Sequence, residues 1–259
     1  MRNIWTIAKR EYDHYFITPI AYVVAFVILL VLGFIFVLVL QGATQSALYG
    51  YPTAPNVTAV NWWFAFLLLF GTPALTMRLL ADEMKTGTIE LLLTAPIRDH
   101  ELVIGKWLGS LFFILSVLAV TLIYPIILNG IVIGSVTILP PLVTPSIDRQ
   151  LLLSSYLGII LIAASFLALG VGISAMFSNQ VAAFFVTLIT CLGLFFLIGF
   201  PANMLPSGGS FFQYMVMSTH FDEAFNIGRI QVSDLVYYFS LIVLGLFMGT
   251  TAVEVRRWR

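Results

Sequence analysis

The most constraining feature of the sequence is an uninterrupted apolar run from Ile20 to Leu40. Wound as an α-helix, this run is about 31 Å long, which matches the hydrocarbon thickness of a bilayer. Because backbone groups in lipid must be satisfied within their own segment, such a run folds as a transmembrane helix. Similar apolar segments cover residues 62–80, 107–129, 151–177, 181–200 and 235–254. The sequence therefore predicts an all-α integral membrane protein with six transmembrane helices, the first over 20–41.

Composition supports this class for the whole chain of 259 residues. Hydrophobic residues make up 60% and charged residues only 9%, with a mean hydropathy of +1.03, whereas about 25% of a soluble domain is charged. The single cysteine, Cys191, lies in an apolar run, which excludes a disulfide framework and a thiolate metal cluster. We expect Cys191 to be a small core side chain and residues 1–259 to form one transmembrane domain.

The N-terminal residues 1–18 have the pattern of an amphipathic helix. The apolar arc holds Ile4, Trp5, Ala8, Tyr12, Tyr15 and Phe16, and the opposite arc holds Arg2, Lys9, Arg10 and Asp13. This pattern predicts a helix that lies in the membrane interface. A secretory signal is the alternative, but no small-residue cleavage site follows the charged region.

The distribution of positive charge predicts the orientation of the six spans. Ten of the 12 Lys and Arg residues would share one side with both termini and the segment 81–106; these are Arg2, Lys9, Arg10, Arg78, Lys85, Arg98, Lys106, Arg256, Arg257 and Arg259. By the positive-inside rule this side is cytoplasmic. We therefore expect a multi-pass protein of the cytoplasmic (inner) membrane with both termini in the cytoplasm.

The segment 81–106 interrupts the apolar pattern between the second and third spans. Drawn as a helix, it places carboxylates on one stripe and leucines on another. The first stripe holds Glu83, Gly87, Glu90 and Thr94, the second holds Met84, Thr88, Leu91, Leu92 and Ala95, and Pro96 ends the helix. A short cytoplasmic helix of this kind is expected to contact a partner in the aqueous phase. The alternative without a functional role is that Glu83, Glu90 and Glu101 are only solvated charges.

The segment 201–234 holds short apolar pieces that cannot cross a bilayer. It could form a re-entrant hairpin or lie on the outer surface. Within it, His220 with Asp222 and Glu223 could form an outer metal site, although a surface turn or helix cap is the preferred interpretation. The 22 phenylalanines could line a path for an apolar substrate, but lipid contact is the simpler interpretation.

The sequence lacks the residues that would drive transport within this chain. Away from their ends the six spans contain no ionisable side chain, which a proton- or ion-coupled carrier requires. A Gly-Lys-Ser/Thr phosphate loop and a pair of histidines at metalloprotease spacing are also absent. We therefore expect no enzyme activity, catalytic residue, metal or cofactor in this chain. Energy for transport would come from a partner chain.

Two motifs resemble permeases of the ABC type-2 exporter family. The first is Glu83-x-x-x-Gly87-Thr88-Ile89-Glu90-x-Leu92-Leu93-x-x-Pro96, followed by Glu101-Leu102-Val103-x-Gly105-Lys106. The second comprises His220-Phe221, Gly228, Ile230, Asp234, Tyr237-Tyr238 and the ending Arg256-Arg257-Trp258-Arg259. The ending is similar to permeases of the gliding-motility and copper-enzyme-maturation branch.

The resemblance implies a function and a set of partners. The chain would be a permease subunit of an ATP-driven exporter, forming the substrate path as a homodimer or heterodimer in the lipid bilayer. A separate ATP-binding subunit would hold ATP and Mg and dock on the coupling segment; no nucleic-acid partner is expected. The implied contact residues are Glu83, Gly87, Thr88, Glu90, Leu91, Leu92, Thr94 and Pro96. The alternative function is a membrane-anchored scaffold that recruits a cytoplasmic partner without transport.

Overall fold

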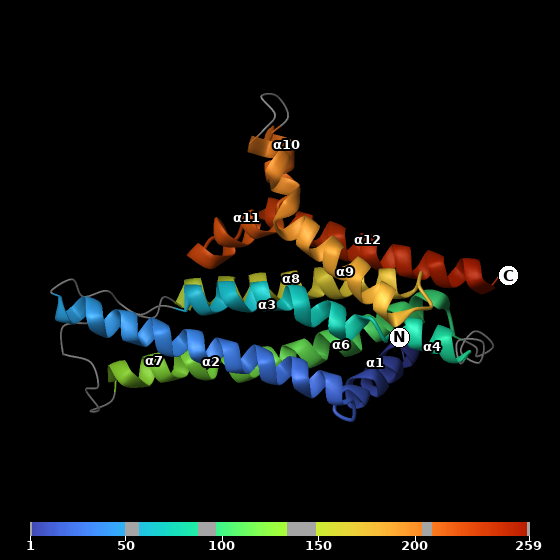
Figure 1. Ribbon diagram of the computed structural model, residues 1–259, viewed down its shortest axis with the longest axis horizontal. Helices are drawn as coiled ribbons and strands as arrows, with labels where there is room; N and C mark the ends of the chain where they lie inside the picture. The colour runs from blue at the N-terminus through green and yellow to red at the C-terminus, as the bar shows by residue number, and fades with distance from the viewer. Residues whose placement is uncertain (1, 50–56, 88–96, 134–148, 204–208, 258–259) are drawn as a thin grey trace.

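The computed structural model describes residues 2–49, 57–87, 97–133, 149–203 and 209–257, and these residues form helices without any strand. The long helices run side by side along one axis of the molecule (Figure 1). They are α2 (Pro19–Leu48), α3 (Thr58–Thr76), α6 (Asp99–Thr121), α8 (Arg149–Ser174) and α12 (Val232–Arg257). The all-helical prediction is confirmed for the part of the chain that is described.

Five helical stretches within these ranges are long and apolar enough to cross a membrane. They are Pro19–Ser46, Thr58–Thr86, Asp99–Leu128, Arg149–Ser174 and Val232–Arg257. The segment 181–200, predicted as one span, differs: α9 (Gln180–Phe195) has 16 residues, and a 3-10 helix, η1 (Leu197–Asn203), follows it. At 1.5 Å per residue α9 is about 24 Å long, shorter than the hydrocarbon core. Six crossings therefore stay a prediction.

Helix α8 forms the centre of the bundle. It packs against α12, α3, α6 and α9, and its side chains are buried along most of its length. Its contact with α12 is close enough to bring backbones together: a Cβ added to Gly245 would lie 2.5 Å from the carbonyl carbon of Ala168, and one added to Gly172 would lie 2.5 Å from the oxygen of Gly245. Small residues at these positions thus let the two helices approach closely.

The helix ends differ from the predicted span ends because polarity marks the bilayer boundary and not the end of a helix. Helix α2 continues to Leu48, beyond the predicted end at 41, and the Thr44 hydroxyl donates to the Leu40 carbonyl at 2.7 Å. Helix α6 begins at Asp99, well before the predicted start at 107. It ends at Thr121, since Pro125 has no N–H for the Thr121 carbonyl. A second helix, α7 (Ile123–Ile133), follows it.

The N-terminal helix α1 (Arg2–Tyr15) packs against α6. Gly105 and Gly109 of α6 make room for it, because a Cβ at Gly109 would lie 2.6 Å from the Cβ of Glu11. The predicted apolar arc is split: Ala8 and Tyr15 are buried against the bundle, whereas Trp5 is 61% exposed. The helix itself is confirmed, and its place in a membrane interface stays a prediction.

The segment after η1 leaves the bundle and returns to it. Helix α10 (Gly209–Met215) projects away from the bundle axis, and α11 (Met217–Asp222) and η2 (Phe225–Ile227) follow it (Figure 1). Both α11 and η2 contact α8, and Phe221 and Phe225 are fully buried there. The apolar piece over 221–227 therefore forms part of the core, whereas Phe211 in α10 is 62% exposed.

Candidate functional site

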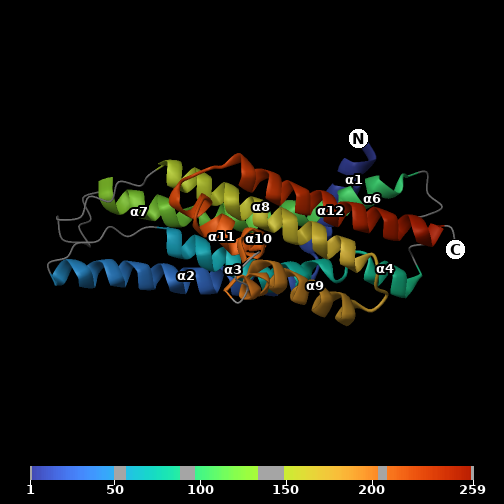
Figure 2. The ribbon, with the colours of Figure 1, turned by 90° about the horizontal axis from the view of Figure 1, so that it is seen from above.

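One end of the bundle gathers the elements that the charge pattern predicts on a common side. Both chain ends lie there with α1 and α4 (Ala81–Thr86), as Figures 1 and 2 show. The carboxyl-terminal end of α12 is tied to the start of α6, because Arg257 Nη2 lies 2.8 Å from Asp99 Oδ1. We call this region the α4 end of the bundle.

Helix α4 is the part of the predicted coupling segment that lies against the bundle. The sequence predicts one helix through Gly87 to Ala95, but α4 ends at Thr86, and Gly87 follows in the left-handed region at φ 72°. Only glycine adopts this conformation readily, so it ends the helix as a C-cap. The prediction of a continuous stripe through Gly87 is therefore wrong. The other predicted contact residues lie outside the described residues: Thr88, Glu90, Leu91, Leu92, Thr94 and Pro96.

A buried ionic group joins three helices at the α4 end. Lys106 Nζ of α6 lies 2.8 Å from Glu11 Oε1 of α1 and 2.8 Å from Glu83 Oε1 of α4. Lys106 is 2% exposed, so its ammonium depends on these carboxylates in place of water. Glu83 is thus turned into the protein, whereas the sequence interpretation assigned it to a partner. We call Glu11, Glu83 and Lys106 the ionic triad.

Sequence reasoning missed the other two members of the triad. Glu11 carried a signal, since it lies three residues after Ala8 and four before Tyr15 on the arc that is buried. A carboxylate on a buried arc requires a cationic partner. Lys106, directly after Gly105 on a helix that packs closely, is the partner that the tertiary structure supplies.

Two further contacts hold α4 to the bundle. The Ser174 hydroxyl at the end of α8 accepts hydrogen bonds from the backbone N–H groups of Leu80 and Ala81, both at 3.2 Å. These donors belong to the first turn of α4, which has no partner for them within its own helix. In addition, Gln180 at the start of α9 donates to the carboxylate of Asp82. Helix α4 is therefore bonded directly to α6, α8 and α9, and it is linked to α1 through Lys106.

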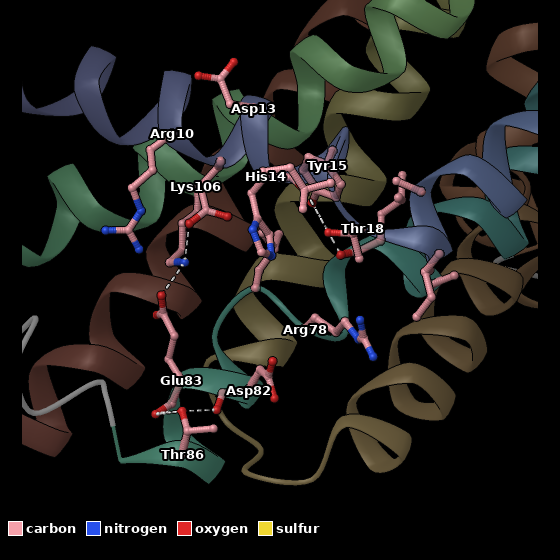
Figure 3. Close-up of a pocket in the computed structure, with 17 residues that line it drawn as sticks. Arg10, Asp13, His14, Tyr15, Thr18, Arg78, Asp82, Glu83, Thr86 and Lys106 are labelled. Carbon is pink, nitrogen blue, oxygen red and sulfur yellow. Dashed lines mark hydrogen bonds and ion pairs between the residues drawn. The ribbon is translucent and has the colours of Figure 1, made fainter.

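A cavity of about 640 Å³ opens beside the triad, between α1, the start of α2, the end of α3 and α4. Figure 3 shows the charged side chains around it, including Arg10, His14 and Arg78. Its wall is closed in part by Tyr15, whose hydroxyl donates to the Leu75 carbonyl at 3.4 Å. The remainder of the wall is apolar and comes from the turn between α1 and α2 and from the end of α3: Ile17, Ile20, Ala21, Ala74, Leu75 and Leu79.

The less favoured alternative of an outer metal site at His220, Asp222 and Glu223 is not supported by the structure. Nδ1 of His220 lies 2.7 Å from Asp234 Oδ1, and its Nε2 lies 2.7 Å from the Tyr214 carbonyl oxygen. Asp222 instead accepts a hydrogen bond from Trp62 Nε1 at 3.1 Å, and burial raises the pKa of its carboxyl above the usual range. No group of three metal-ligating side chains occurs among the described residues. His220 is also buried, at 8% exposure, so the preferred surface turn is wrong too.

These features define a class of protein: a multi-pass helical membrane protein with charged side chains gathered at one end of the bundle. The chain belongs to the ABC-2 family transporter proteins, because the model of that family matches residues 53–243. This match begins before the second predicted span, extends into α12 and includes the whole predicted coupling segment. The comparison with curated proteins found no match. Permeases of this family work with an ATP-binding subunit, and their membrane domain is not itself an ATPase.

Proposed function

We propose that this chain is the permease subunit of an ATP-driven exporter and receives motion from a separate ATP-binding subunit through the segment 81–106. One observation carries the proposal: α4 lies at the end of the bundle, directly before the predicted contact residues, and is bonded to three other helices. A displacement of α4 cannot stay local, because each of these bonds would have to stretch or move with it.

The triad would be the main route for such a displacement. Lys106 is held by α1 on one side and by α4 on the other, with both contacts at 2.8 Å. Ion pairs this short and buried resist separation, since breaking one leaves a charge without water or partner. Movement of α4 would therefore draw α1 and α6 with it, and Ser174 would transmit the same movement to α8.

The roles of the predicted contact residues follow from this arrangement. Glu83 acts inside the permease, as a member of the triad. Glu90 is proposed to meet a basic group of the ATP-binding subunit, and Leu91 and Leu92 an apolar slot. Gly87 ends α4 in the left-handed conformation, directly before these residues. Residues Thr88, Thr94 and Pro96 complete the proposed contact.

The finer features of the function rest on the resemblance. They are a dimer of permease chains, export as the direction, ATP and Mg bound by the partner, and the gliding-motility and copper-enzyme-maturation branch. An inner-membrane location with cytoplasmic termini follows from the positive-inside rule. The common position of both chain ends and α4 supports that topology (Figure 1).

Co-purification from native membranes in mild detergent tests the docking. An ATP-binding subunit should be recovered with the intact chain and lost when residues 88–94 are scrambled. Scrambling residues 42–48, at the opposite end of the bundle, is the control and should leave recovery unchanged. Recovery of the intact chain without any ATP-binding subunit would refute the proposal and favour the scaffold alternative.

A charge reversal tests coupling in the assembled complex. Glu90→Lys should lower the ATPase activity of the complex while leaving membrane insertion intact. Glu254→Lys makes the same reversal on an exposed residue of α12 at the α4 end and should have little effect. Full ATPase activity in the Glu90→Lys complex would show that this residue has no role in coupling.

A further inference from the structure

The cavity at the α4 end is lined by two arginines and a histidine. The side chains of Arg10, His14 and Arg78 line it, and none of the three makes a hydrogen bond or ion pair with another described residue. The two arginines lie on either side of His14 in the close-up (Figure 3). Guanidinium groups at a concave site bind phosphate oxygens strongly, through two parallel N–H bonds each.

The carboxylates of the same cavity are mostly occupied. Glu11 and Glu83 bind Lys106, and Asp82 accepts a hydrogen bond from Gln180. Asp13 is exposed and also lines the cavity. None of these carboxylates forms an ion pair with Arg10 or Arg78 among the described residues, although the charge of Arg10 acts on Glu83. The carboxylates still give the cavity a mixed charge, which favours a ligand that carries a positive group beside its negative one.

The apolar wall of the cavity continues onto a face that is open to lipid. Ile17 and Ile20 line the cavity at the start of α2, and Ile17 is 77% exposed. Beyond them, the outward face of α2 exposes large apolar side chains: Tyr22, Val23, Phe26, Val27 and Leu30. A molecule with its head in the cavity could thus extend an alkyl chain along α2. A small soluble anion would leave this apolar surface uncovered.

We propose that this cavity binds the headgroup of a zwitterionic phospholipid, with its phosphate on Arg10 and Arg78 and its acyl chains along α2. The volume of about 640 Å³ is within the range of ligand pockets. The expected location of α1 in the membrane interface places the arginines at the depth of lipid phosphates. The ionic triad also lines this cavity, but binding of a lipid there does not depend on the proposed docking of an ATP-binding subunit.

Native mass spectrometry of the purified full chain tests the proposal, with phosphatidylethanolamine added in known amounts. The double variant Arg10→Ala/Arg78→Ala should bind the lipid at least tenfold more weakly than the unchanged chain. Lys9→Ala/Lys85→Ala removes two exposed charges that do not line this cavity and should change binding less than twofold. Equal loss in both variants would overturn the proposal, because it would indicate unspecific attraction of lipid to positive charge.

Two competitors distinguish the sources of the phosphate. Excess inorganic phosphate should leave the lipid bound, since it cannot replace the chains on the apolar wall. Displacement by inorganic phosphate would overturn the assignment to lipid and indicate a site for a free anion. Phosphatidylglycerol, which lacks the ammonium group, should bind more weakly than phosphatidylethanolamine. Equal or tighter binding of phosphatidylglycerol would overturn the zwitterionic assignment.

A variant without charge change covers the case in which the double arginine variant does not fold. Ala74 lines the cavity from α3, so Ala74→Trp should fill part of the volume and lower lipid retention at least tenfold. Size-exclusion chromatography and far-UV circular dichroism establish that this variant is folded. Unchanged lipid retention in folded Ala74→Trp would overturn the proposal.

Discussion

Removing the charge of Lys106 tests the structural role of the ionic triad. Lys106→Met keeps an unbranched side chain of similar length but leaves Glu11 and Glu83 facing each other without a cation. The side chains of Lys106, Glu11 and Glu83 are only 3%, 10% and 15% exposed, so water cannot replace the ammonium. Breaking a buried ion pair by removing one partner costs about 3–5 kcal/mol.

The loss in free energy of unfolding caused by Lys106→Met should lie near the middle of that range. Two contacts of 2.8 Å are lost together, which raises the cost. Uptake of a proton by one carboxyl group offsets part of it, because each pKa unit of adjustment corresponds to about 1.4 kcal/mol. We expect a loss of about 4 kcal/mol in the free energy of unfolding.

The assay is equilibrium unfolding of the purified chain in mixed micelles with increasing SDS, followed by circular dichroism. A triple variant, Glu11→Gln/Glu83→Gln/Lys106→Met, is the matched control, since it removes the charges on both sides. It should recover at least half of the stability lost in Lys106→Met. Replacing all partners of a buried ion pair by neutral side chains costs far less stability than removing one partner and leaving the other charged. A change below about 0.5 kcal/mol in Lys106→Met, the size typical of a surface substitution, would refute the buried triad.

Three further perturbations probe other parts of the structure. Gly87→Ala places a Cβ at φ 72° and should cost about 1–2 kcal/mol; the same SDS titration measures it, and no change would show that Gly87 is not left-handed. Gly109→Leu should displace α1, because even a Cβ would lie 2.6 Å from Glu11, and limited proteolysis of α1 should accelerate at least tenfold. The pKa of Asp222 is raised in the folded state, which therefore holds the proton more tightly than the unfolded state. The free energy of unfolding should accordingly fall as the pH rises from the ordinary pKa of 3.8 to the raised pKa of the folded state. Asp222→Asn should remove this slope, and a slope that persists in the variant would assign it to another group.

The spans were the most predictable part of the fold. A run such as 20–40 has one stable arrangement in lipid, so its helical state follows from composition and length. Helix ends were less predictable, because a polar stretch such as Gln41–Leu48 stays helical when its neighbours allow it. The segment 181–200 shows the other limit: it is apolar throughout, yet the α-helix ends at Phe195 and a 3-10 helix follows.

The candidate site was predictable only as a segment. The charges of 81–106 marked it as a contact region, and its first helix lies at the common end of the bundle. The helical spacing of the side chains continues past Gly87, so it predicted one helix. The left-handed conformation that ends α4 at Gly87 does not alter this spacing and could not be seen in it. The assignment of Glu83 to a partner was wrong for a related reason: the pattern shows that a carboxylate is present but not which cation lies beside it.

The sequence by itself determined that this chain is a helical membrane protein, where its apolar runs lie and which side carries the positive charge. These properties depend on composition and on neighbours along the chain, because each apolar segment in lipid must satisfy its own backbone hydrogen bonds. Only the tertiary structure decided that Glu11 and Lys106, 95 residues apart, share a buried ion pair, and that Arg10 and Arg78 line one cavity. Such pairings depend on how helices cross, which is set by the packing of the whole bundle and is absent from any local pattern.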